Sequence, residues 1–287
     1  LVADFTGDGI ADVIQLFNTN GAFYKGKAAG EFENGVDSPV CFGKGRGKGW
    51  IGDYDFDGLP DIVTVGEEGL RMWQNTAGKL ELAMSTGEVN YIAQPNCIDG
   101  MTCDFNNDGR QDFLVVYAPD SNIQSQLFFN RGWRSTGHAH KPIDLQEANL
   151  LTQEAGAGQQ SGCMGDFNND GGQDMIVVAP NGDVFVLYRA VAAGEGLSVR
   201  VTLSTKEGPI GPINVTARPG VPCSAAGSDD KLCMGAWPVT AGSTSAFFGL
   251  RRGDTVHVQW KLPDGTVQQD KVVVKDGPVS LVIKPKK

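Results

Sequence analysis

The chain contains the segment Asp53-Tyr54-Asp55-Phe56-Asp57-Gly58-Leu59-Pro60-Asp61, and the same pattern also occurs at residues 4–12, 104–112 and 166–174. We call these four segments loops 1 to 4 in chain order. Each has aspartate at positions 1, 5 and 9, a side-chain oxygen donor at position 3 and glycine at position 6. A hard cation such as Ca²⁺ takes about 6–8 oxygen ligands, and glycine permits the sharp turn that folds a loop around it. The repeat therefore predicts calcium-binding loops.

The expected ligands of up to four Ca²⁺ ions are the side chains at positions 1, 3, 5 and 9 and the backbone carbonyl at position 7. Loop 1 is the weakest, because its position 3 offers only the neutral hydroxyl of Thr6. The alternative is a set of metal-free surface turns, which four copies with the same glycine and the same following strand disfavour. The candidate ligands are Asp4, Thr6, Asp8, Ile10, Asp12, Asp53, Asp55, Asp57, Leu59, Asp61, Asp104, Asn106, Asp108, Arg110, Asp112, Asp166, Asn168, Asp170, Gly172 and Asp174.

The residues that follow the loops argue against an EF-hand, which needs a bidentate glutamate at position 12. That position holds Gln15, Thr64, Val115 and Val177. Each loop instead runs into an apolar stretch such as Asp61-Ile62-Val63-Thr64-Val65. Such a stretch is typical of a strand and not of an exiting helix.

The loops recur about every 50–60 residues, a length typical of one supersecondary unit. In the second unit the sequence predicts four strands separated by the turn residues 66–69 and 76–79. These strands cover residues 50–53, 61–65, 70–75 and 80–84. Four strands in a unit of this length are typical of a β-propeller blade.

With their Asp-Phe-Asn-Asn-Asp-Gly-x-x-Asp core and trailing strand, the loops resemble FG-GAP/VCBS repeats, the calcium-binding propeller blades of integrin α chains and many secreted proteins. The resemblance covers about residues 1–190. It implies an all-β fold in which each loop holds Ca²⁺ between the first two strands of a blade. About four blades lie in this chain, and we expect them to be part of a larger propeller, since closed propellers have about 4–8.

The ends of this blade array look open in the sequence. The fourth unit shows no outer strand after residues 184–188 and runs into a linker at 191–196, whereas Leu1 already begins on an inner strand. Open ends expose unpaired strand edges. We therefore expect further blades before Leu1 or, as the less favoured alternative, a homo-oligomer or filament joined through strand edges.

Residues 197–287 are predicted to form a second, small β-sandwich-like domain. Its expected strands cover residues 197–204, 213–217, 255–260 and 268–274, with a Pro-Asp-Gly turn at 263–266. The stretch Ala246–Leu250, followed by Val256–Gly265, resembles the ASPIC/UnbV module of cartilage acidic protein-like secreted proteins. Lys261-Leu262 and a cysteine-containing segment at 219–240 are departures from that module.

Composition narrows the choice of partners. The net charge of −10 is concentrated in the aspartates of the loops, so it does not indicate a cationic partner. No basic face or aromatic stacking motif points to nucleic acid. No run approaches the ~18 apolar residues of a membrane span and no signal peptide is seen, so we expect a soluble chain. The resemblance implies an extracellular, secreted or cell-surface protein.

Six cysteines suggest disulfides in a secreted chain, with buried free thiols as the alternative. Cys223 and Cys233 flank a polar turn and are the best local pair. The other four, Cys41, Cys97, Cys103 and Cys163, allow three pairings, which the sequence leaves open. Asn214-Val215-Thr216 fits the N-glycosylation pattern, so Asn214 is a candidate acceptor.

No nucleophile–base arrangement, Gly-x-Ser-x-Gly motif or phosphate loop is found. The sequence therefore favours a non-catalytic extracellular adhesion or structural protein, with loops made rigid by calcium and with a protein or glycan partner. The alternative is a carbohydrate-active enzyme or lectin on a calcium-binding propeller. Its candidate residues, His138 and His140, lack an evident third partner, and the basic segment 43–49 is expected to be an exposed loop between blades.

Overall fold

The protein is described from a computed structural model. The described residues are 1–85, 95–104, 110–118, 126–130, 138–142, 161–178, 182–188, 197–203, 213–219, 236–239, 244–250, 252–275 and 279–284. Throughout these ranges the fold is almost entirely β, with a single short 3₁₀ helix at Ala28–Gly30. In the described part of the chain, no helix has the length and apolar character needed to cross a membrane.

Four antiparallel sheets follow one another along residues 1–188. The first contains β1 (Val2–Ala3), β2 (Asp12–Leu16), β3 (Gly21–Tyr24) and β4 (Val36–Ser38). The second contains β5 (Gly47–Gly52), β6 (Asp61–Gly66), β7 (Gly69–Thr76) and β8 (Lys79–Ser85). The third contains β9 (Cys97–Cys103), β10 (Asp112–Tyr117), β11 (Gln126–Asn130) and β12 (His138–Pro142), and the fourth β13 (Ser161–Gly165), β14 (Asp174–Val178) and β15 (Val184–Leu187).

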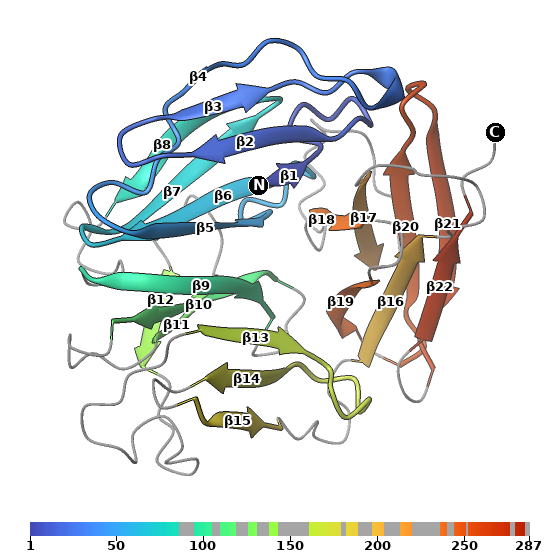
Figure 1. Ribbon diagram of the computed structural model, residues 1–287. Helices are drawn as coiled ribbons and strands as arrows, with labels where there is room; N and C mark the ends of the chain where they lie inside the picture. Colours follow the sequence, from blue (N-terminus) through green and yellow to red (C-terminus); the bar gives the residue numbers. More distant parts are fainter. Residues whose placement is uncertain are drawn as a thin grey trace.

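Each sheet has the strand order of a propeller blade, and each predicted metal loop joins the first two strands of its blade. The expected strands of the second unit are confirmed, as is the strand after every loop. Blade 4 has three strands among the described residues, and the linker expected at 191–196 lies outside them. The blades form an open arc and not a closed ring (Figure 1).

Side chains of the second strand of a blade point alternately to its two faces, and this alternation explains how the blades stack. In β6, Ile62 packs with Phe5 and Ile14 of blade 1, whereas its neighbour Val63 packs in a cluster with Phe113 of blade 3. Successive side chains of a strand point to opposite faces, so one strand supplies two interfaces. Both faces of the middle blades are therefore buried, which is why these strands read as continuous apolar runs.

The outer face of blade 4 differs, because apolar side chains on β15 and just after it remain exposed. Val184 is 60% exposed and Tyr188 62%. This agrees with the expectation of an open end. Association through this end or through strand edges stays a prediction.

Residues 197–284 form two further sheets that share one core. One sheet has the order β19 (Thr244–Leu250), β16 (Leu197–Leu203), β22 (Val279–Ile283), and the other β18 (Ala236–Val239), β17 (Ile213–Pro219), β20 (Thr255–Lys261), β21 (Val267–Val273). Strands β16 and β22 run parallel and the other pairs antiparallel. Val199, Val215 and Trp260 lie in the shared core, as expected for the predicted sandwich.

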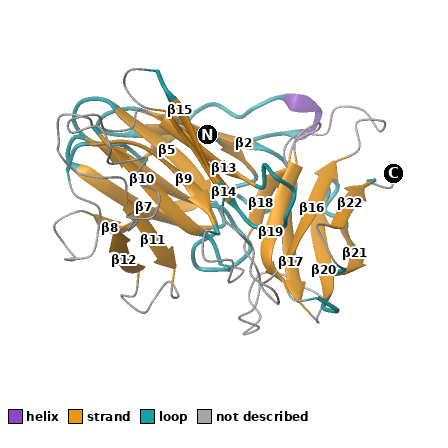
Figure 2. Cartoon of the chain, turned by 90° about the horizontal axis from the view of Figure 1, so that it is seen from below, coloured by secondary structure: helices purple, strands orange, loops and turns teal. Residues whose placement is uncertain are grey.

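The C-terminal sandwich lies beside both ends of the blade arc (Figures 1 and 2). Asn214 Nδ2 donates to the carbonyl of Asp4 at 2.6 Å, and Lys261 Nζ donates to the carbonyl of Gly7 at 2.8 Å, so β17 and β20 contact loop 1. Arg200 on β16 pairs with Asp166 in loop 4. The sequence did not indicate that this domain would contact the first and fourth blades together.

Candidate metal centre

The described loops share a backbone scaffold built on their position-1 aspartates. Asp4 accepts hydrogen bonds from the amides of Asp8 (3.0 Å) and Gly9 (2.7 Å), and Asp166 accepts from those of Asp170 (3.1 Å) and Gly171 (3.1 Å). The position-6 glycines make this possible, because Gly9, Gly58 and Gly171 have φ of 88°, 90° and 93°. A side chain rarely adopts this left-handed conformation, so the glycine expected at the turn is required by the backbone.

The position-9 aspartates are completely buried and brace each loop against its blade. Asp61 Oδ2 accepts from the Tyr54 amide at 3.0 Å within the loop, and Oδ1 accepts from the Asn75 amide at 2.8 Å, at the end of the third strand. Asp12 makes a similar pair of contacts, with the amide of Thr6 at position 3 of loop 1 and with that of Gly26 just after the third strand. This residue therefore has a structural task in addition to its predicted role as a ligand.

Positions 3 and 5 also bind the backbone of their own loops. Asp57 Oδ1 accepts from the Leu59 amide at 2.8 Å, and Asp55 Oδ1 accepts from the Asp57 amide at 3.2 Å. Loops 1 and 4 repeat the position-5 contact at 2.9 and 2.8 Å. These hydrogen bonds from backbone amides orient the carboxylates before any ligand binds.

Loop 2 brings three carboxylates into one cluster. One oxygen each of Asp53, Asp55 and Asp61 lies within 4.8 Å of the others, and Asp53 and Asp61 are buried. Asp55 also accepts from Gln74 Nε2, a neutral donor, at 2.7 Å. Asp57 is exposed and stands outside this cluster. Several hard oxygens converging on one point fit a divalent cation such as Ca²⁺.

The electrostatics of these loops also favour a cation. Burial, together with the charges of Asp55 and Asp53, raises the pKa of Asp61 well above its ordinary value. In loop 1, burial first and then the charges of Asp8 and Asp12 raise the pKa of Asp4 to about 6. These carboxylates resist ionisation in the folded protein, and a bound positive charge would favour their ionised form.

Loops 1 and 4 place protein cations near their aspartates. Lys25 Nζ lies 3.1 Å from Asp8 Oδ2 in loop 1, and Arg200 pairs with Asp166 in loop 4. Among the described residues, neither loop forms a carboxylate cluster like that of loop 2. In loop 3, Asp104, Arg110 and Asp112 are described, whereas Asn106 and Asp108 lie outside the described residues.

Sequence reasoning missed the amide side chains that connect one loop to the next. Asn75 Nδ2 donates to the carbonyl of Phe5 at 2.8 Å, and Asn130 Nδ2 donates to that of Tyr54 at 2.9 Å. Asn75 is the penultimate residue of β7 and Asn130 the last residue of β11, so both lie at the end of the third strand of a blade and reach position 2 of the preceding loop. Their shared place at the strand end was the signal that could have revealed them.

Two glutamines add a second link between neighbouring loops. Gln111 Oε1 accepts from the Asp53 amide at 2.8 Å, and Gln173 Oε1 accepts from the Asp104 amide. Each glutamine occupies position 8 of the following loop. The backbone amides of Asp53 and Asp104 are therefore each bound by a side chain of the following loop.

The remaining candidates have mixed outcomes. In the described part of the chain, Cys41, Cys97, Cys103 and Cys163 form no disulfide, so the expectation of bridges among these four is wrong there. The cause lies in the fold, because Cys97 and Cys103 pack in different clusters on opposite faces of blade 3. Cys223 and Cys233 lie outside the described residues.

Asn214 is tied into the domain contact by the nitrogen that a glycan would modify. Its Nδ2 donates to the Asp4 carbonyl, so a glycan on this nitrogen would lie directly at the domain contact. His138 and His140 lie on β12, which pairs with β11.

A comparison with known protein families supports the presence of the repeats. Residues 53–115 and 104–177 match the family model of the FG-GAP-like repeat. No curated protein matches the chain. A solved structure of a lectin from Agrocybe aegerita, described as recognising non-reducing terminal N-acetylglucosamine, shares 15% identity with a TM-score of 0.42, covering 96% of this chain and 66% of that one.

A second solved structure, the Tc holotoxin pore of Photorhabdus luminescens, shares 14% identity with a TM-score of 0.42. The match covers 91% of this chain and 14% of the toxin chain. The chain thus spans less than two thirds of either protein. The family match and the stacked antiparallel sheets together identify residues 53–177 as FG-GAP-like repeats in an array of β-propeller blades.

Proposed function

We propose that this chain is a non-catalytic, calcium-binding propeller segment of an extracellular adhesion or structural protein. The observation that carries the proposal is the cluster of Asp53, Asp55 and Asp61 in loop 2, whose carboxylate oxygens lie within 4.8 Å of one another. The FG-GAP-like repeat supports the same assignment. Calcium would supply positive charge at the point where these carboxylates converge.

The residues of loop 2 have distinct tasks in this proposal. Asp53, Asp55 and Asp61 would hold the ion, and the sequence predicts the Leu59 carbonyl and Asp57 as further oxygen donors. Asp61 also binds the amides of Tyr54 and Asn75, so it joins the ion to the blade. Binding would therefore stiffen the connection between strands β5, β6 and β7 and keep the blade surface in one shape for a protein or glycan partner.

Calorimetric titration with CaCl₂ and thermal unfolding with and without calcium test the proposal. We expect calcium to raise the melting temperature, since a ligand that binds only the folded state stabilises it by about 2.7 kcal/mol at a hundredfold excess over Kd. A Kd of about 10⁻⁴–10⁻³ M would suit an extracellular module. Mg²⁺ should stabilise less, because it demands a tighter octahedral set of ligands.

Asp55→Ala is the informative variant, with Asp37→Asn as its control. Asp55 belongs to the cluster, whereas Asp37 is an exposed aspartate on β4 outside every loop. We expect Asp55→Ala to lose one calcium site and Asp37→Asn to bind like the wild type. Equal calcium binding in all three proteins would refute a calcium site in loop 2.

A further inference from the structure

We propose that Arg200 of the C-terminal sandwich supplies the positive charge of loop 4, so that this arginine and a divalent cation exclude each other there. The inference rests on the proposed calcium function of the loops. It concerns loop 4, where Arg200 takes the place of the ion. It assigns loop 4 as a docking site for the protein's own C-terminal domain.

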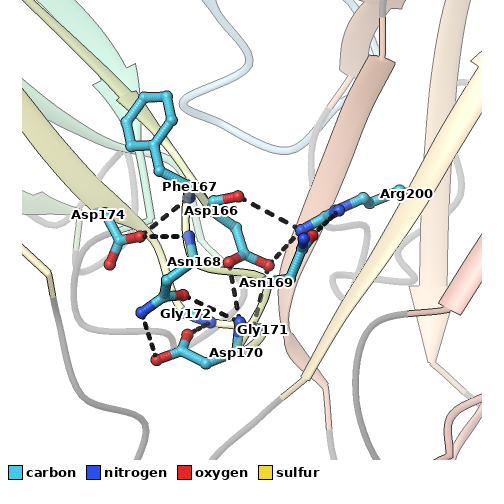
Figure 3. Close-up of polar contacts among 9 residues, drawn as sticks. All are labelled: Asp166, Phe167, Asn168, Asn169, Asp170, Gly171, Gly172, Asp174 and Arg200. Atoms are coloured by element: carbon cyan, nitrogen blue, oxygen red, sulfur yellow. Dashed lines mark hydrogen bonds and ion pairs between the residues drawn. The ribbon is translucent and has the colours of Figure 1, made fainter.

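The contacts of Arg200 centre on the first ligand position of loop 4 (Figure 3). Its Nη2 pairs with Asp166 Oδ2 and lies 3.4 Å from the Asp166 carbonyl oxygen, while Nη1 donates to Asn169 Oδ1. The Asp166 side chain is 2% exposed and that of Arg200 24%. Position-1 aspartates are buried in the other loops as well, so what distinguishes Asp166 is the direct ion pair with the guanidinium.

Loop 4 has the same scaffold as loop 1, so the arginine is an addition to it and not a replacement for part of it. Asp166 keeps the bonds from the Asp170 and Gly171 amides that Asp4 makes with Asp8 and Gly9. Position 5 also keeps its bond to the amide at position 7. A loop that is shaped to present oxygen ligands thus has one of them already engaged by a cation.

Loop 2 provides the contrast. Asp53, Asp55 and Asp61 converge within 4.8 Å, and Asp55 accepts a hydrogen bond from the neutral amide of Gln74. In loop 4 the described aspartates form no such cluster, and a guanidinium occupies Asp166. The two loops therefore differ in the arrangement and in the described contacts of their aspartates.

Mutual exclusion follows from charge and from shared atoms. Asp166 Oδ2 cannot give its best interaction to Arg200 and to a divalent ion together, and two cations within a few ångströms repel strongly in a partly buried site. Coupling between binding events is reciprocal, so an ion in loop 4 would weaken the contact made by Arg200. Calcium level and domain contact are thereby linked at this one loop.

Calorimetric calcium titration of the full chain and its variants tests the inference. We expect Arg200→Ala to gain one calcium site, or to bind calcium at least tenfold more tightly at one site, relative to the wild type. The double variant Arg200→Ala/Asp166→Ala should lose that gain, which would place the new site in loop 4. Arg46→Ala, an exposed arginine before β5, controls for the loss of one positive charge and should match the wild type.

Conservative variants separate charge competition from simple opening of the domain contact. Arg200→Lys keeps the charge and should retain wild-type calcium binding, whereas Arg200→Gln keeps most of the side-chain stem and should gain the site. Arg200→Gln also replaces Arg200→Ala if the latter fails to fold. Equal gains in the lysine and glutamine variants, or no gain in either uncharged variant, would overturn the inference.

Asp55→Ala, measured in the same series, distinguishes this inference from the proposed function. Loss of a site in Asp55→Ala without any gain in Arg200→Ala would support calcium binding in loop 2 and overturn the role of Arg200. The reverse result would support the role of Arg200 and refute calcium binding in loop 2. No binding in any variant would refute both.

Discussion

The side-chain amide of Asn130 donates a 2.9 Å hydrogen bond to the backbone carbonyl of Tyr54, a residue 76 positions earlier in the chain. The backbone amide of the same asparagine binds Asp112, the last aspartate of loop 3. One residue thus joins loop 3 of its own blade to loop 2 of the preceding blade. Asn75 repeats the arrangement between Asp61 and Phe5. The loops are therefore linked in a series across blades 1 to 3.

Replacement of these asparagines should destabilise the blade array. We expect Asn75→Ala and Asn130→Ala each to lower the free energy of unfolding by roughly 1–3 kcal/mol, because buried partners are left without a hydrogen bond. Urea unfolding measures this. Asn18→Ala is the control, since Asn18 makes one exposed bond to the Gly45 carbonyl and should cost much less. Equal losses at all three positions would contradict a special role for the link.

The buried hydroxyl of Tyr54 provides a second test. It accepts from Trp50 Nε1 at 2.9 Å and lies 2.9 Å from the Thr102 hydroxyl of the next blade. We expect Tyr54→Phe to cost roughly 1–3 kcal/mol in urea unfolding. Tyr24→Phe, which removes an exposed contact with Gln15, should change stability little. A neutral Tyr54→Phe substitution would show that this network does not stabilise the interface.

The contact between loop 1 and the C-terminal domain depends on Gly9. A Cβ atom there would lie 2.3 Å from the Leu262 carbonyl oxygen, and the residue has φ of +88°. We expect Gly9→Ala to lose about 1–2 kcal/mol from the left-handed backbone and, in addition, to separate the domains. Small-angle scattering should show a larger radius of gyration.

Gly265→Ala is the matched control for this prediction. Gly265 has φ of +84° but nothing within 4 Å of its Cβ position. It should share the backbone cost and keep the wild-type radius of gyration. If both variants have the wild-type radius, the predicted role of the Leu262 contact is wrong.

Acidity should stabilise the calcium-free protein. Burial and neighbouring carboxylates raise the pKa of Asp4 to about 6, and the pKa values of Asp12 and Asp61 are also raised, with burial as the main cause. An unfolded aspartate has a pKa of about 3.9, so between about pH 4 and 6 the folded state binds more protons than the unfolded state. The free energy of unfolding then falls as the pH rises through this window.

Thermal unfolding in a chelator should therefore give a higher melting temperature at about pH 5 than at about pH 7. Saturating calcium should remove or reverse the difference, because a bound cation favours the ionised carboxylates. A calcium-free protein that loses stability steadily on acidification from about pH 7 would contradict the raised pKa values.

The sequence predicted the local features of this protein because they depend on short-range chemistry. Asp–Gly spacing marks the loops, and an apolar run such as Asp61–Val65 marks the strand after each one, since turn geometry and strand pattern are set by neighbouring residues. The blade order followed from the same repeat. From the sequence, Ile62 and Val63 belong only to one apolar run, and tertiary structure assigned their stacking partners to different blades.

Only the tertiary structure decided the contacts between residues that are far apart in the chain. Asn130 and Tyr54 meet across two blades, and Arg200 reaches Asp166 from another domain. No local pattern encodes such pairs, because they depend on the twist and spacing of stacked sheets and on how the sandwich lies beside the arc. For the same reason, four nearly identical loops could be recognised from sequence, yet their different charge partners could not.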